Sequence, residues 1–259
     1  MSKFDKLDFE SLKKIEEKVF NGVFECDALR SSHDSSLNQR YYLKAVKYYS
    51  AWLKYEENKD VLLNLAASHF KLKQYVKTIQ ILTKAIELYP DDIKDYYIPT
   101  CFNLRAWAYC LSGNYEESII DYTRCKEWDS SYHWCYFRGQ AHFHYKHYHE
   151  AICDFSEVLK VQKHWSAQLY WRAKSYLKLK EYNKAIEDYT RLMDNRDESS
   201  FLYLRRGKAY KKLGEYGKAK IDFELANSIK NDTFGMSFIN YLEIYYHLIT
   251  SNIKNHIKK

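Results

Sequence analysis

The stretch from Tyr203 to Ala226, YLRRGKAYKKLGEYGKAKIDFELA, decides how the chain folds. It divides around Gly214 into two segments, and each segment places its apolar residues three and four positions apart. This spacing puts the apolar residues on one stripe of a helix, so the stretch predicts two short helices joined by a turn. Gly207 and Ala219 are small where the two helices must approach each other closely.

Copies of this unit recur along the chain, and neither helix of a unit can bury its stripe without neighbouring copies. The small position of the second helix is occupied in turn by Ala45, Thr78, Ser118, Ala151, Ala185 and Ala219, at separations of 33, 40, 33, 34 and 34 residues. A period near 34 residues with this pattern of small and large side chains resembles the tetratricopeptide (TPR) repeat. Five full units keep the pattern, and a sixth, at the N-terminal side, keeps only its second helix.

The resemblance implies an all-α protein, a TPR-type α-solenoid in which antiparallel helix pairs form a right-handed superhelix. One continuous solenoid domain is expected to have three parts. Residues 1–57 hold an N-terminal helix near Asp8 to Phe20, with Asp8 as its N-cap, and the divergent first repeat. Residues 58–231 hold the five TPR units, and residues 232–259 hold a capping helix over about 234–254. The apolar stripe of that helix consists of Phe238, Tyr241, Leu242, Tyr245, Leu248 and Ile249.

The same C-terminal segment has an alternative role as a homodimer contact. Three of its apolar residues, Ile239, Ile244 and Tyr246, lie off the main stripe and would leave apolar surface exposed. Both interpretations remain open at this point.

Composition excludes several classes of protein. No apolar run reaches the roughly 18 residues of a membrane span, and no start resembles a signal peptide, so we expect a cytoplasmic protein. The six cysteines have no paired C-x-x-C spacing, which favours reduced thiols over a disulfide framework or a zinc site. The chain has no phosphate-cradling glycine loop, G-x-S-x-G or H-E-x-x-H motif, and we therefore expect neither an enzyme nor a cofactor.

Two charged residue types recur in register with the repeat. Arginine stands at one first-helix position in four successive units, and aspartate stands at one second-helix position of the same units. Because Arg can bridge a carboxylate through two parallel hydrogen bonds, the two series predict an Arg–Asp ladder between paired helices. The residues are Arg105, Arg138, Arg172 and Arg206 with Asp121, Asp154, Asp188 and Asp222.

The expected function follows from the family resemblance. In TPR proteins the first helix of each pair lines a concave groove, which implies a scaffold or adaptor that binds a partner peptide there. The groove is expected to be aromatic at its centre and basic at its C-terminal end, which suits a segment with a large apolar side chain beside an acidic run. The expected peptide-binding residues are Asn64, Trp107, Tyr136, Phe137, Phe143, Tyr170, Trp171, Lys174, Lys178, Arg205, Lys208, Lys211 and Lys212. The alternatives are packing between first helices for the aromatic residues and a solvated face for the charges.

A narrower hypothesis is a co-chaperone that binds the acidic C-terminal tail of a heat-shock chaperone. Residues 41–88 resemble the TPR part of immunophilin-type co-chaperones, and Asn64 matches one residue of their carboxylate clamp. Lys13 could supply the first clamp lysine, but Glu17 then stands where that family has Asn, and Leu104 stands where it has Arg.

Nucleic acid and metal were weighed as further ligands. The net charge of +7 permits RNA binding, but 34 acidic residues against 41 basic ones form an ordinary surface, so nucleic acid is not the expected partner. His142, His144, His147 and His149 cluster in a short stretch. His142 takes the position of an inward-facing tyrosine, and no Cys or carboxylate stands at convincing ligand spacing, so no metal site is expected.

The clamp hypothesis generates a direct test. A peptide ending in Glu-Glu-Val-Asp is expected to show no low-micromolar binding to this chain in a calorimetric titration, because Glu17 would repel its terminal carboxylate and Leu104 would offer it no donor. Tight binding that Asn64→Ala abolishes would contradict this expectation.

Overall fold

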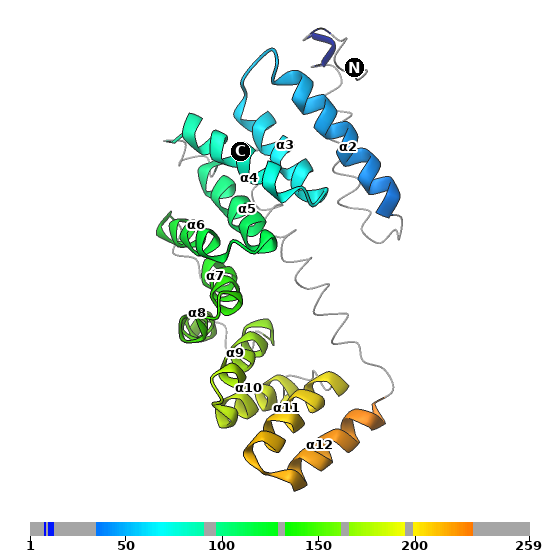
Figure 1. Ribbon diagram of the computed structural model, residues 1–259, viewed down its shortest axis with the longest axis vertical. Helices are drawn as coiled ribbons and strands as arrows, with labels where there is room; N and C mark the ends of the chain where they lie inside the picture. The colour runs from blue at the N-terminus through cyan, green and yellow to red at the C-terminus, as the bar shows by residue number, and fades with distance from the viewer. Residues whose placement is uncertain are drawn as a thin grey trace. The chain divides into compact units, whose positions relative to one another are not determined.

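A computed structural model describes residues 8, 10–12, 35–90, 97–128, 133–161, 166–194 and 199–229, and all regular structure in these residues is helical. The chain divides into an N-terminal unit, Met1–Asp121, and a C-terminal unit, Tyr122–Lys259. Figure 1 shows the helices in chain order. They are α2 (Ser35–Trp52), α3 (Lys59–Lys71), α4 (Tyr75–Leu88), α5 (Tyr97–Ser112), α6 (Tyr115–Trp128), α7 (His133–His144), α8 (Tyr148–Val161), α9 (Ser166–Lys178), α10 (Tyr182–Asp194), α11 (Ser200–Leu213) and α12 (Tyr216–Ser228).

These helices confirm the five predicted pairs, from α3 and α4 to α11 and α12. Within each unit a helix packs on its partner and on the neighbouring pair, for example α9 on both α8 and α10. The small residues of the second helices are all buried, as the period predicted; they are Thr78, Ser118, Ala151, Ala185 and Ala219. The fold is therefore an all-α solenoid of TPR-type helix pairs.

The first repeat begins with a helical turn at Glu10–Leu12. The Asp8 carboxylate accepts a hydrogen bond from the Ser11 amide at 2.7 Å, which confirms Asp8 as the N-cap. Leu12 is buried against α2, and the Tyr48 hydroxyl donates to its carbonyl oxygen at 2.9 Å. This turn thus packs against the second helix of the divergent first repeat.

Glycines permit the close contact between paired helices. A Cβ placed on Gly207 would lie only 2.8 Å from a ring carbon of Phe223, and the same holds for Gly139 and Phe155. At the turn between α11 and α12, Gly214 adopts a positive φ of 83°, a conformation that L side chains rarely take. The sequence of residues 203–226 predicts both the close contact and the turn, because glycine stands at each position.

The predicted Arg–Asp ladder is present. The Nε and one terminal nitrogen of Arg105 donate to both oxygens of Asp121 at 2.8 Å. In the C-terminal unit the same two-bond arrangement joins Arg138 to Asp154, Arg172 to Asp188 and Arg206 to Asp222.

Each ladder arginine also makes a third hydrogen bond, which was not predicted from the sequence. Its remaining terminal nitrogen donates to a hydroxyl on the second helix of the preceding pair. The acceptors of Arg105, Arg138, Arg172 and Arg206 are Thr83, Thr123, Ser156 and Thr190 respectively. One side chain therefore connects three helices.

Some expectations fall on residues outside the described ranges. These are the capping helix over 234–254 and most of the N-terminal helix with Lys13 and Glu17. Residues 91–96, between α4 and α5, also lie outside them. No helix within the described ranges is long and apolar enough to cross a membrane.

The close contact at Gly207 can be tested with one methyl group. Gly207→Ala is expected to lower the free energy of unfolding by about 1–3 kcal/mol, because the new methyl group overlaps the ring of Phe223. Gly217→Ala on α12 is the matched control, since nothing lies within 4 Å of its Cβ position. The control is expected to be neutral or to stabilise by roughly 0.5–1 kcal/mol. Equal urea denaturation curves for the two variants would contradict the observed packing.

Candidate functional site

The first helices of the C-terminal unit contact one another through aromatic rings. Phe143 on α7 and Trp171 on α9 have ring centroids 5.2 Å apart, in an edge-on arrangement. Tyr170 on α9 and Phe201 on α11 are 5.6 Å apart. These contacts join three successive first helices on one face, which we call the first-helix face.

The structure corrects part of the predicted aromatic site. Tyr136 has no exposed surface, so it offers nothing to a partner and instead packs on Phe137 and Phe155. Four other predicted rings are mainly buried, with exposed fractions of 6–9%; these are Phe137, Phe143, Tyr170 and Trp171. Packing between helices, the alternative considered for them, therefore accounts for most of the surface of each residue.

A lysine lies over the exposed edge of this aromatic layer. The Lys174 ammonium is 4.1 Å from the centroid of Trp171, 4.8 Å from that of Phe143 and 5.7 Å from that of Tyr170. The attraction between an ammonium group and aromatic rings offsets only part of the free energy that the group loses when burial removes its water. Lys174 is half-buried, and its position is set by rings from α7 and α9.

A second cation lies beside it on α11. The Arg205 guanidinium is 4.8 Å from the Phe201 centroid, and its charge acts on Lys174. Within the described residues neither cation forms an ion pair, whereas every ladder arginine has a carboxylate. We call these residues the basic–aromatic patch: Phe143, Tyr170, Trp171, Lys174, Phe201 and Arg205.

The electrostatics of the patch favour an anion. Burial, together with the nearby charges of Arg205 and Lys178, lowers the pKa of Lys174 to about 8. Burial and the charge of Lys174 also lower the pKa of His144. A positive charge is thus costly here, and an incoming negative charge would remove that cost.

Uncharged donors are also left without acceptors near the patch. The indole Nε1 of Trp171 is buried and has no hydrogen-bond partner among the described residues. The same is true of the amide nitrogen of Gln140 on α7, which occupies the repeat position of Lys174 one pair earlier. Helical spacing places Gln140 on the groove side of its unit, but it gives no sign that its amide nitrogen lacks an acceptor.

The remaining predicted residues lie in two places. Lys178, Lys208, Lys211 and Lys212 are exposed on α9 and α11. Asn64 and Trp107 belong to the N-terminal unit, where both are half-buried and Trp107 packs on Phe70 at 5.2 Å. Leu104, at the position of a clamp arginine, is buried.

One group of side chains has the composition of a metal site. The ligand atoms of Cys135, Asp154 and Glu157 lie within 4.8 Å of one another. However, the Lys126 ammonium is 2.9 and 2.8 Å from the two Glu157 oxygens, and Arg138 holds both oxygens of Asp154. Cations of the chain itself already neutralise these carboxylates, so we interpret the group as an ion-pair network.

The histidines of the cluster at residues 142–149 have different surroundings in the structure. His142 is half-buried, 3.9 Å from Asp154, and burial lowers its pKa. Its ring stacks on that of His147 at 6.0 Å, while His144 lies edge-on to Trp171 at 5.7 Å. His142 therefore takes the inward position that the sequence analysis expected.

Comparison with known proteins agrees with this architecture. Models of the tetratricopeptide repeat match residues 60–92, 99–132, 169–199 and 202–233, which together make up half of the chain. The chain belongs to the tetratricopeptide-repeat family. No curated protein matches it by sequence.

Several solved structures share the fold. MamA from Desulfovibrio magneticus RS-1 has a TM-score of 0.59 at 14% identity, over 68% of this chain and 99% of that one. YrrB, described as a TPR protein with an unusual peptide-binding site, has a TM-score of 0.56 at 13% identity, over 73% and 92%. A TPR protein from Parabacteroides merdae ATCC 43184 has a TM-score of 0.52 at 18% identity, over 91% and 99%. At these identities the likeness concerns the fold alone.

Removing the half-buried charge of Lys174 is expected to stabilise the folded protein. Lys174→Met keeps an apolar stem on the rings and is expected to raise the melting temperature at pH 7, because the folded state disfavours the ammonium. The parent should gain stability as the pH rises from about 8 towards the ordinary lysine pKa, since the unfolded chain then binds more protons.

The advantage of Lys174→Met over the parent should therefore shrink across that pH range. Lys160→Met, at an exposed site on α8, is the control and is expected to leave the melting temperature unchanged. A destabilised Lys174→Met variant would show that the cation–π contacts outweigh the cost of burial.

Proposed function

We propose that this chain is a protein-interaction scaffold that holds an acidic segment of a partner protein on the basic–aromatic patch. The single observation that carries the proposal is the pair of half-buried cations, Lys174 and Arg205, which form no ion pair with a carboxylate of the described residues. Unpaired charges at such sites destabilise the free protein, and an anionic ligand would stabilise it.

The patch suits a carboxylate for geometric reasons. Arg205 can donate two parallel hydrogen bonds to one carboxylate, and the Lys174 ammonium can bind it as a point charge. The small exposed parts of Phe143 and Trp171 offer contact to a neighbouring apolar side chain. The exposed lysines of α9 and α11 would add long-range attraction and so raise the association rate more than the affinity.

An acidic peptide fits this surface better than RNA does. Phosphates could also neutralise the two cations, but bases bind such surfaces by stacking on exposed aromatic faces. The patch residues Phe143, Tyr170 and Trp171 are buried, and the Lys174 ammonium lies over the Trp171 ring, so little aromatic surface is open to stacking. The burial of Leu104 likewise disfavours the co-chaperone alternative, because that position offers no cationic group.

The proposal predicts the effect of removing either cation. The probe is a fluorescent peptide with one leucine followed by a run of aspartate and glutamate, measured by anisotropy. Arg205→Gln and Lys174→Gln are each expected to weaken binding by about 1.5–3 kcal/mol, the usual size of a hydrogen bond to a charged group. Lys160→Gln on α8 is the matched control, because it removes the same charge at an exposed site away from the patch.

The pH dependence gives an independent check on the same site. Affinity should fall as the pH rises through about 8, where Lys174 loses its proton, and Lys174→Gln should remove this dependence. Replacing Lys208, Lys211 and Lys212 by Glu should slow association. If Arg205→Gln and Lys160→Gln behave alike at every pH, the partner binds elsewhere.

A further inference from the structure

A histidine on α7 stands beside the basic–aromatic patch. His144 is the last residue of α7, and its ring lies edge-on to Trp171 of α9, with the two centroids 5.7 Å apart. The neighbouring ring of Phe143, which belongs to the patch, is 5.6 Å away. His144 nevertheless remains exposed to solvent. A ligand that occupies the patch can therefore reach this imidazole.

The charge of Lys174 connects this histidine to the cations of the patch. Contact with the two rings removes part of the water around the imidazole, and this loss, together with the positive charge of Lys174 on α9, lowers the pKa of His144. The charges of Arg205 and Lys178 act in turn on Lys174. Four basic groups thus act on one another at this point of the surface, with Lys174 at their centre.

The repeat register gives the same helical position a cation in the two later pairs. His144 is the counterpart of Lys178 on α9 and of Lys212 on α11, at the period of 34 residues, and both lysines are exposed. One pair earlier the position holds Leu111, which ends the series. Three successive first helices therefore carry a basic side chain at one position. Of the three, the histidine is the side chain whose ordinary pKa lies near neutral pH.

We propose that His144 is a further binding residue of the patch, and that its protonated ring donates a hydrogen bond to the acidic segment of the partner. The proposal rests on the function proposed above, because it requires an anion at Lys174 and Arg205. A carboxylate held there would attract a proton to the imidazole, just as the charge of Lys174 repels one in the free protein. The acidic segment is then held by three cations in place of two.

Binding and protonation are coupled in this arrangement. The complex holds more protons than the free protein at any pH between the two pKa values of His144, because the bound anion raises this pKa. Affinity therefore rises as the pH falls through that range. Each unit by which the pKa rises corresponds to about a tenfold gain in affinity. This gain on the acid side is separate from the loss near pH 8, where Lys174 releases its proton.

The nearby His142 is not suited to this role. Its Nε2 lies 3.9 Å from a carboxylate oxygen of Asp154, and its ring stacks on that of His147. Its Nδ1 is buried and has no hydrogen-bond partner among the described residues. A partner on the first-helix face cannot reach this nitrogen, so protonation of His142 is expected to affect the stability of the fold rather than the affinity.

The fluorescent acidic peptide used above tests the proposal when its anisotropy is measured at two pH values. The parent is expected to bind about three- to tenfold more tightly at about pH 5.5 than at about pH 7, where the acidic side chains of the peptide are ionised at both values. His144→Gln keeps a hydrogen-bond donor but takes up no proton, and it should lose this gain. His149→Gln is the matched control, because it removes a histidine at an exposed position on α8, and it should behave as the parent does.

A permanent charge at the same position provides a rescue. His144→Lys introduces the cation that the two later pairs carry there, and it should bind at about pH 7 as tightly as the parent does at about pH 5.5. Circular dichroism of each variant checks that the helices are retained.

Proton uptake is an independent readout of the same coupling. Calorimetric titrations of the peptide into the parent at about pH 6.5, in two buffers of different ionisation enthalpy, should show that binding takes up protons. Lys174 contributes little to this uptake, since its pKa of about 8 keeps it protonated already. His144→Gln should abolish the uptake, and His149→Gln should not.

The possible failures separate this proposal from the proposed function. Peptide binding that depends on Arg205, but shows the same pH dependence and proton uptake in the parent and in His144→Gln, would overturn the role of His144 and leave the patch as the binding surface. Loss of the pH dependence in His149→Gln would assign the proton to another histidine and also overturn it. No binding of the peptide to the parent at either pH would refute the proposed function, and the role of His144 with it.

Discussion

The structure depends on one repeated interaction, the arginine of a first helix held by the aspartate of its paired second helix. The four aspartates have exposed fractions of only 2–4%, so each arginine neutralises a carboxylate that water cannot reach. Removing one partner of such a pair leaves an uncompensated buried charge, at a cost of about 3–5 kcal/mol. The third hydrogen bond, to a hydroxyl of the preceding pair, makes the same arginine connect neighbouring repeats. Paired helices and stacked repeats are thus held in register by one side chain.

The patch on the first-helix face differs from the ladder in one physical respect. Arg205 and Arg206 are adjacent in sequence, yet Arg206 points between helices towards Asp222, while Arg205 lies on Phe201 and pairs with no carboxylate among the described residues. Because successive residues of a helix point about 100° apart, the same helix can serve the fold with one arginine and a ligand with the next. The ladder arginines are neutralised by aspartates and stabilise the fold. Lys174 and Arg205 have no such partner among the described residues, and they belong to the surface that we propose binds a partner.

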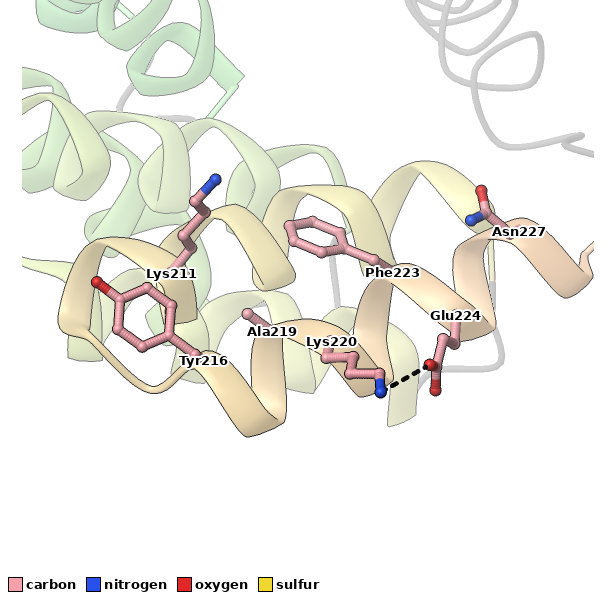
Figure 2. Close-up of a pocket in the computed structure, with 7 residues that line it drawn as sticks. All are labelled: Lys211, Tyr216, Ala219, Lys220, Phe223, Glu224 and Asn227. Atoms are coloured by element: carbon pink, nitrogen blue, oxygen red, sulfur yellow. Dashed lines mark ion pairs between the residues drawn. The ribbon is translucent and has the colours of Figure 1, made fainter.

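The aromatic residues show that helical periodicity does not predict whether a ring is buried or exposed. Tyr136 and Phe143 were both predicted at groove positions, but Tyr136 is completely buried and Phe143 exposes an edge beneath Lys174. Helical spacing places a residue on a face of its own helix. It does not say how closely the next first helix approaches, and that distance decides whether a ring packs or binds. On α12 the opposite case occurs: Tyr216 and Phe223, together with polar side chains, line a hollow that no described helix covers (Figure 2).

The sequence by itself determined the helix pairs, their small contact residues, the turn at Gly214 and the Arg–Asp pairing. All of these repeat with the 34-residue period, and each depends on neighbours within one helix pair. Only the tertiary structure revealed the hydroxyl acceptors such as Thr190, the unpaired state of Lys174 and Arg205, and the burial of Tyr136. These depend on contacts between successive pairs, where residues about one period apart meet through packing that no local pattern encodes.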